Sequence, residues 1–182
     1  MSASFGFKQT DLGTLRTFIG MWTYSTDGEF TINSGNASAE DMTILIATSA
    51  GDIGTGCQMD FNDVNMTAGS WFHVVVVFDG SLTGNANRLK VWVNNVAKTL
   101  TVGGGAVPAT LLDGGATLFL GKFGGILNRF YNGAMDLVGL WNRALTAGEV
   151  ATLYSGGAGL VYPFTPTAKA SRFRNSIRIG IG

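Results

Sequence analysis

The sequence is short of the residues that most often carry chemistry. It has one cysteine, Cys57, and one histidine, His73, and its glutamates are Glu29, Glu40 and Glu149. A single cysteine excludes a disulfide within the chain, and a single histidine excludes a histidine-rich metal site. The patterns of a serine triad, a phosphate loop and a dinucleotide-binding fingerprint are also absent. We therefore expect a protein that is not an enzyme.

The few acids and the histidine fit structural roles. Glycoside hydrolysis needs two carboxylates that face each other, and Asp27-x-Glu29 is the single alternating pair with a glutamate. This pair lies in a predicted hairpin turn, where we expect solvated acids. Glu149 follows Thr146 at the spacing of a capping box. His73 lies in an apolar strand, which favours a hydrogen-bonded core histidine.

Long hydrophobic runs and a secretory leader are missing as well. No apolar run approaches the roughly 20 residues that span a bilayer, so we expect no membrane insertion. The N-terminus has no basic segment followed by an apolar one, which predicts synthesis in a reducing compartment. The basic residues form no stripe along the chain, so no nucleic-acid partner is expected.

The composition is typical of strands and turns. Glycine is abundant, at 27 residues, and only 13% of the residues are charged. The run at residues 71–78 predicts a central strand covered on both faces. Asn94-Asn95 predicts a two-residue hairpin turn, and the capping box predicts one helix at residues 147–154. We expect an all-β, antiparallel two-sheet sandwich at residues 1–162, followed by an extended C-terminal arm at residues 163–182.

An ordered set of short motifs resembles the laminin-G-like domain of the concanavalin A-like lectin and glucanase superfamily. The match covers about residues 4–160, and its motifs include Trp71-x-His73-Val74, Leu118-x-Leu120-Gly121, Tyr131-x-Gly133 and Trp141-Asn142-Arg143. The resemblance implies a jelly roll. Because the family spans adhesion modules, lectins and viral structural proteins, it implies no single function. Family members usually have an extra strand before the one predicted at residues 4–8.

The resemblance also suggests two kinds of site. Carbohydrate binding would use exposed aromatic rings with amide partners, and the candidates are Trp22, Tyr24, Trp92, Tyr131 and Asn132. No cofactor is required, but relatives often hold calcium near the edge of the sandwich. The candidate calcium ligands are Asp60, Asp63, Asp79 and Asp136.

The C-terminal arm is the sharpest local signal. Residues 165–182 hold four basic residues and no acid, so the remaining eight basic and twelve acidic residues leave −4 on the body. Isoleucines alternate with other residues, as in a half-buried strand. The predicted assembly residues are Arg172, Phe173, Arg174, Ile177, Arg178, Ile179 and Ile181. The arm could pair with its own sheet, replacing the missing strand, or with a neighbouring subunit. Both alternatives stay open here.

These observations predict a non-catalytic structural or adhesive component of a multi-subunit particle, namely a bacteriophage virion protein. It would decorate the capsid or belong to the tail, be made in the host cytoplasm, and be anchored to other protein subunits by its arm. The alternative is a lectin-like carbohydrate-binding module for cell-surface adhesion, located outside the cell or on its surface and bound to a cell-surface glycan.

Overall fold

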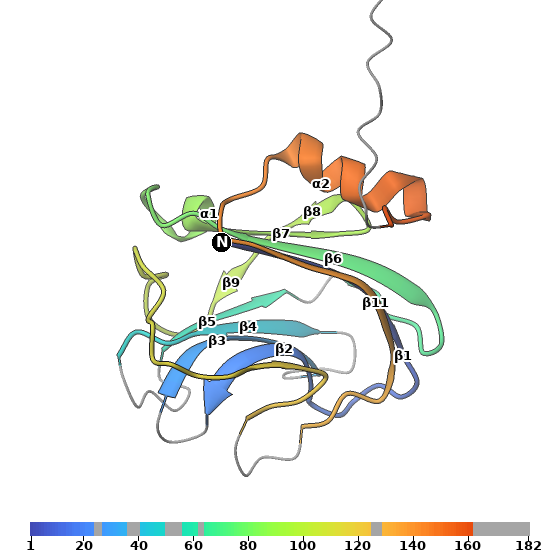
Figure 1. The fold of residues 1–182 in the computed structure, drawn as a ribbon, viewed down its shortest axis with the longest axis horizontal. Coiled ribbons are helices and arrows are strands. Elements are labelled where there is room, and N and C mark those ends of the chain that lie inside the picture. Colours follow the sequence, from blue (N-terminus) through green and yellow to red (C-terminus); the bar gives the residue numbers. More distant parts are fainter. Residues whose placement is uncertain (24–26, 36–40, 50–55, 62–63, 125–128, 162–182) are drawn as a thin grey trace, which may run out of the picture.

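The computed structural model describes residues 1–23, 27–35, 41–49, 56–61, 64–124 and 129–161. Two antiparallel sheets stack face to face with the main core between them (Figure 1). The five-stranded sheet has the order β11 (Gly133–Trp141), β1 (Ser2–Gln9), β6 (Trp71–Phe78), β7 (Leu89–Val93) and β8 (Val96–Lys98). The six-stranded sheet has the order β10 (Leu118–Leu120), β2 (Arg16–Thr23), β3 (Asp27–Ser34), β4 (Met42–Ile46), β5 (Cys57–Phe61) and β9 (Thr101–Val102). The predicted all-β sandwich is confirmed.

The central strand β6 is covered on both faces, as its continuous apolar sequence predicts. Val74 and Val76 belong to the core between the sheets. Val75 and Val77 point to the outer face, where they pack with Leu145 and with residues of the helix α2 (Ala147–Tyr154). Figure 1 shows α2 lying across this outer face. The outer face of the five-stranded sheet therefore carries a second, smaller core.

Local signals at the turn and the helix are confirmed. Asn94 and Asn95 have φ of 49° and 63°, the left-handed values that a tight two-residue hairpin between β7 and β8 requires. Thr146 and Glu149 form the predicted capping box at the start of α2, which ends in the short 3-10 turn η1 (Ser155–Gly157). The glycine, serine, asparagine and threonine residues at 79–87 predict a loop, but the four-residue helix α1 (Asn85–Arg88) begins within it, so one helix was missed.

Two predictions about the first strands are wrong. The alternation of Phe5 and Phe7 with Gly6 and Lys8 predicts a strand with one buried face, but β1 is buried on both, because α2 and its neighbouring residues cover the outer face as well. Glu29 was expected to be a solvated turn acid, but it lies within β3 and is 7% exposed. Strand β3 begins at Asp27, earlier than the turn signal suggested. The carbonyl oxygen of Glu29 accepts a hydrogen bond from the N–H of Ala47.

Candidate binding cleft

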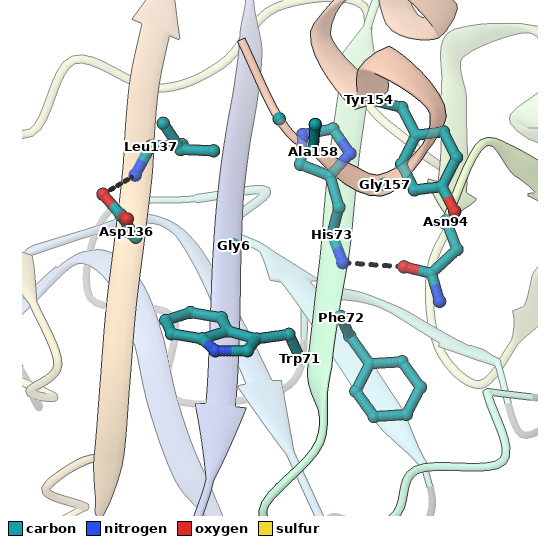
Figure 2. A pocket seen from close by; sticks show the side chains of 11 residues that line it. Gly6, Trp71, Phe72, His73, Asn94, Asp136, Leu137, Tyr154, Gly157 and Ala158 are labelled. Atoms are coloured by element: carbon teal, nitrogen blue, oxygen red, sulfur yellow. Dashed lines mark hydrogen bonds between the residues drawn. The ribbon is translucent and has the colours of Figure 1, made fainter. Parts of the chain in front are cut away.

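The outer face of the five-stranded sheet is hollowed beside the end of α2. The cavity has a volume of about 300 Å³, and strands β1, β6 and β11, the β7–β8 turn and the segment after α2 all line it (Figure 2). Strand pairing explains why these residues meet: Gly6 of β1 lies opposite His73 of β6 on one side and Asp136 of β11 on the other. Gly6 has no side chain, so the floor of the cavity stays open between its neighbours.

An exposed tryptophan forms one wall of the cleft. Trp71 is the first residue of β6, and 51% of its surface is exposed. Its ring lies beside Gly6, and the Lys8 ammonium sits 5.4 Å from the ring centroid. An indole in this position offers a broad apolar face at the surface, with a cation fixed against it.

His73 lies deeper in the cleft, two residues along the same strand. It is 8% exposed, and its Nε2 lies 2.9 Å from the hydroxyl oxygen of Ser4. The Nδ1 atom is buried and has no hydrogen-bond partner among the described residues. Burial lowers the pKa of His73 below its usual 6.5, because the imidazolium would lose its hydration. The ring is therefore held neutral near pH 7. The predicted hydrogen-bonded core histidine is confirmed, and it also lines the cleft.

Asn94 is fixed by two hydrogen bonds to the backbone of His73. Its Oδ1 accepts from the N–H of His73 at 2.9 Å, and its own N–H donates to the carbonyl oxygen of His73 at 2.8 Å. The turn geometry holds the side chain at the cleft, where Figure 2 shows its amide below the Tyr154 ring. The amide nitrogen supplies a hydrogen-bond donor on this wall.

The opposite wall is an irregular part of β11. The register between β1 and β11 shifts between Ser4 and Gly6, and Leu137 has a φ of 53°, as in a β-bulge. Asp136 is exposed, and its Oδ1 accepts from the N–H of Leu137 at 2.7 Å. The bulge thus places Asp136 and Leu137 next to each other on this wall of the cleft, and Figure 2 shows the leucine side chain reaching toward it.

The predicted glycan contacts do not form one site. Trp22 is 2% exposed and packs against Phe123 and Ala47, so the prediction of an exposed ring is wrong for this residue. Trp92 is half-buried against the small core under α2. Tyr131 packs against the main core, and burial raises its pKa to about 12. Asn132 is exposed, with its carbonyl bonded to Thr10 N. Tyr24 lies outside the described residues.

The predicted calcium ligands are likewise separate. Asp60 accepts hydrogen bonds from Thr43 and Gln58, whereas Asp79 accepts two from Ser81. Asp63 lies outside the described residues. In the described part of the chain, no three side chains of histidine, cysteine, aspartate or glutamate gather as a metal site would require. Calcium therefore stays a prediction from the family resemblance.

Glu149 is committed to structure. It forms an ion pair with Arg143, with atom distances of 2.9 Å and 2.5 Å, and it accepts from the N–H of Thr146 at 2.8 Å. The hydrogen bonds from Arg143 lower the pKa of Glu149 to about 2. The predicted assembly residues of the arm, 172–181, lie outside the described residues. No helix in the described part is long and apolar enough to cross a membrane.

The sequence did hold a signal for the cleft. Trp71 and His73 alternate in β6, so they share one face, and Asn94 begins the predicted hairpin turn. We interpreted Trp71 and His73 as parts of a covered strand, because no local pattern shows where α2 stops covering the sheet. Asp136 was singled out, but for calcium.

Residues 2–151 match a family described as the concanavalin A-like lectin/glucanases superfamily, Laminin_G_3, and the chain belongs to this family. Solved structures agree on the fold. The native heptameric SAP-like pentraxin from Limulus polyphemus has a TM-score of 0.64 at 16% identity, over 87% of this chain and 70% of the pentraxin. The CBM40 module of the Ruminococcus gnavus IT-sialidase has a TM-score of 0.60 at 12% identity, over 83% and 80%. That module has also been solved bound to α2,3 sialyllactose. A comparison with curated proteins found no match.

Proposed function

We propose that this protein is a non-catalytic carbohydrate-binding module, and that the cleft beside α2 binds a glycan. The observation that carries the proposal is Trp71, an indole that is 51% exposed on the wall of a 300 Å³ cavity. Sugar rings have an apolar face of C–H groups that stacks on aromatic rings. A half-exposed tryptophan at the mouth of a cavity suits such a ligand.

The polar groups around the ring suit sugar hydroxyls. Asn94 is held rigidly by the backbone of His73 and brings an amide donor. Asp136 brings a carboxylate on the opposite wall. A few fixed donors and acceptors around an apolar surface are the usual makeup of a small-ligand site, and the volume is at the lower end of the range for such pockets. We therefore propose that one short segment of a glycan, rather than an extended chain, occupies the cleft.

The comparisons support this reading over a virion role. Carbohydrate binding is known for a protein of the same fold, the sialidase CBM40 module, which has been solved with α2,3 sialyllactose. At 12% identity this likeness bears on the fold alone, so the sugar is not inferred from it. A module of this kind would act outside the cell or on its surface.

The test is glycan binding by the full chain on a broad array, followed by titration calorimetry with the best ligand. We expect Trp71→Ala to weaken binding at least tenfold, which corresponds to about 1.4 kcal/mol. Phe130→Ala is the matched control, because Phe130 is 49% exposed and does not line the cleft. A flat array, or equal affinities for the Trp71 and Phe130 variants, would contradict the proposal.

A role as a particle component is the second proposal, and it rests on the sequence of the arm. Arg172, Arg174 and Arg178 would meet acidic side chains of neighbouring subunits. Removing residues 165–182 should then abolish incorporation into the particle. Normal incorporation of the shortened protein would contradict this role without affecting glycan binding.

A further inference from the structure

One edge of the five-stranded sheet is long and unprotected. Among the described residues, the nine-residue strand β11 has a strand partner on one side only, β1, so its other side is open to a further strand. Two of its backbone groups already have side-chain partners: the N–H of Leu137 donates to Asp136 Oδ1, and the carbonyl oxygen of Ala134 accepts from the Tyr131 hydroxyl. The opposite edge is different, because β8 has only three residues and ends in Lys98. Proteins protect sheet edges with short strands, lysine or proline, and β11 has neither lysine nor proline. A bulge also protects an edge, and β11 has one at Leu137.

Apolar side chains gather at this same end of the sandwich. Leu140 pairs with the core residue Ala3, so it faces the interior, yet it is 42% exposed. Leu118 and Leu120 of β10 pair with Met21 and Ile19, which also face the core, and they are 38% and 53% exposed. Residues that point inward normally become buried, so the interior is open here.

The edges of the two sheets lie together. The ring of Phe18 in β2 packs at a tilt against those of Phe5 and Phe7 in β1, with centroid distances of 5.3 Å and 4.6 Å. Since β1 faces β2, the neighbouring edge strands β11 and β10 border the same opening. Tyr131 lies between them: its ring packs on Phe18, and its N–H donates to Gly121, the residue after β10. The exposed leucines therefore belong to one apolar opening.

The described chain ends beside this edge. After α2, Leu160 packs with Trp141 of β11, and it lines a small cavity together with Leu137, Val138 and Gly139 of the same strand. The last described residue is Val161, which is 68% exposed. Another 21 residues follow, enough to span about 70 Å when extended at roughly 3.3 Å per residue, so length does not limit their reach along β11.

The sequence of that segment matches the opening. Ile177, Ile179 and Ile181 alternate with Arg178 and Gly180, so in a strand the three isoleucines share one face. The segment carries +4 and the rest of the chain −4, so their attraction favours contact. Pairing within the chain is favoured further because the linkage gives the segment a high effective concentration at β11.

We propose that residues 177–181 of the same chain add a strand to the free edge of β11, with the three isoleucines covering Leu140, Leu118 and Leu120. The five-stranded sheet then has six strands, and Arg178 stays on the solvent side. The proposal is independent of the glycan cleft, which lies on the outer face of the sheet.

Disulfide trapping in the full chain tests this placement. Leu140→Cys is combined in turn with Ile177→Cys, Ile179→Cys and Ile181→Cys, because the register along β11 is open. We expect at least one pair to form a disulfide within the chain, seen as a monomer of altered mobility on a non-reducing gel. The native Cys57 is buried at 0% exposure, and burial raises its thiol pKa, so it stays unreactive. The control places the first cysteine at Val96 of β8, which is 58% exposed at the opposite edge. It should form no such bond.

The outcomes separate the alternatives. A disulfide between two chains would overturn the proposal in favour of exchange between copies. Absence of any disulfide, or equal trapping with Val96→Cys, would overturn it as well. A second measurement avoids new cysteines: hydrogen exchange at residues 133–141 should accelerate at least tenfold in the triple variant Ile177→Ser, Ile179→Ser, Ile181→Ser. Exchange at residues 71–78 is the internal control, and an unchanged rate at residues 133–141 would contradict the strand.

Discussion

Ser4 of β1 and His73 of the neighbouring central strand β6 are diagonal neighbours in the five-stranded sheet, with 2.9 Å between the hydroxyl oxygen and Nε2. The pair joins β1 to β6 under the end of α2, where water has little access. The other ring nitrogen, Nδ1, is also buried. Folding therefore places a titratable ring where only its neutral form is favourable.

This burial predicts a loss of stability in mild acid. The pKa of His73 is lowered in the folded state, so below its unfolded value of about 6.5 the unfolded chain binds the extra proton. The free energy of unfolding should fall as the pH drops from 7 toward 5, by up to about 1.4 kcal/mol per pH unit. Urea unfolding of the wild type and His73→Gln measures this. Carboxyl groups with a lowered pKa, such as Glu149, reduce the free energy of unfolding only below about pH 4.5, so they do not contribute to this slope. Equal slopes for both proteins between pH 5 and 7 would refute the assignment.

Gly6→Ala should separate stability from binding. A Cβ at Gly6 would lie 3.4 Å from the carbonyl oxygen of Asp136 and 3.8 Å from the Trp71 ring, both ordinary contacts. Alanine in place of a strand glycine should leave stability unchanged or raise it by about 0.5 kcal/mol. The methyl group would fill the cleft floor, so glycan affinity should fall severalfold. Thermal unfolding and calorimetry give the two readouts, and full affinity in a stable variant would place the ligand elsewhere.

The β7–β8 turn makes a test of backbone conformation. Asn95 has a φ of 63° and is exposed, so its substitution changes little besides the turn. Asn95→Ala should cost about 1 kcal/mol, because a Cβ crowds the left-handed conformation. Asn95→Gly is the matched control and should keep full stability. Chemical unfolding measures both, and equal stabilities would show that the turn tolerates another geometry.

The cap of α2 should contribute measurably to stability. Thr146 Oγ1 accepts from the N–H of Glu149 at 3.3 Å, and alanine cannot replace that acceptor. Thr146→Ala should lower the free energy of unfolding by about 1 kcal/mol. Thr152→Ala, an exposed position within the same helix, should be neutral or stabilising, since alanine favours helix. If both variants unfold alike, the cap adds nothing.

Turns and helix caps could be predicted from the sequence, whereas the burial or exposure of a side chain by segments far along the chain could not. The left-handed Asn94-Asn95 turn and the capping box depend on residues a few positions apart, so their patterns are complete in the sequence. The exposure of Trp71 and the burial of Trp22 depend on segments far away in the chain. Trp22 is buried by Phe123, a hundred positions along, and Trp71 is exposed because α2 stops short of it. The cleft was missed for this reason.

Because the core under α2 is small, the shape of the cleft depends on whether α2 stays packed on the sheet. Among the described residues, five buried hydrophobic side chains form this core, against 22 between the sheets, so the helix should detach at a lower free energy than global unfolding requires. Tyr154 and Gly157 belong to this detachable unit, whereas Trp71 belongs to the sandwich. A ligand that touches both parts would clamp the helix in place, so occupancy would be visible as slowed amide exchange in residues 147–154.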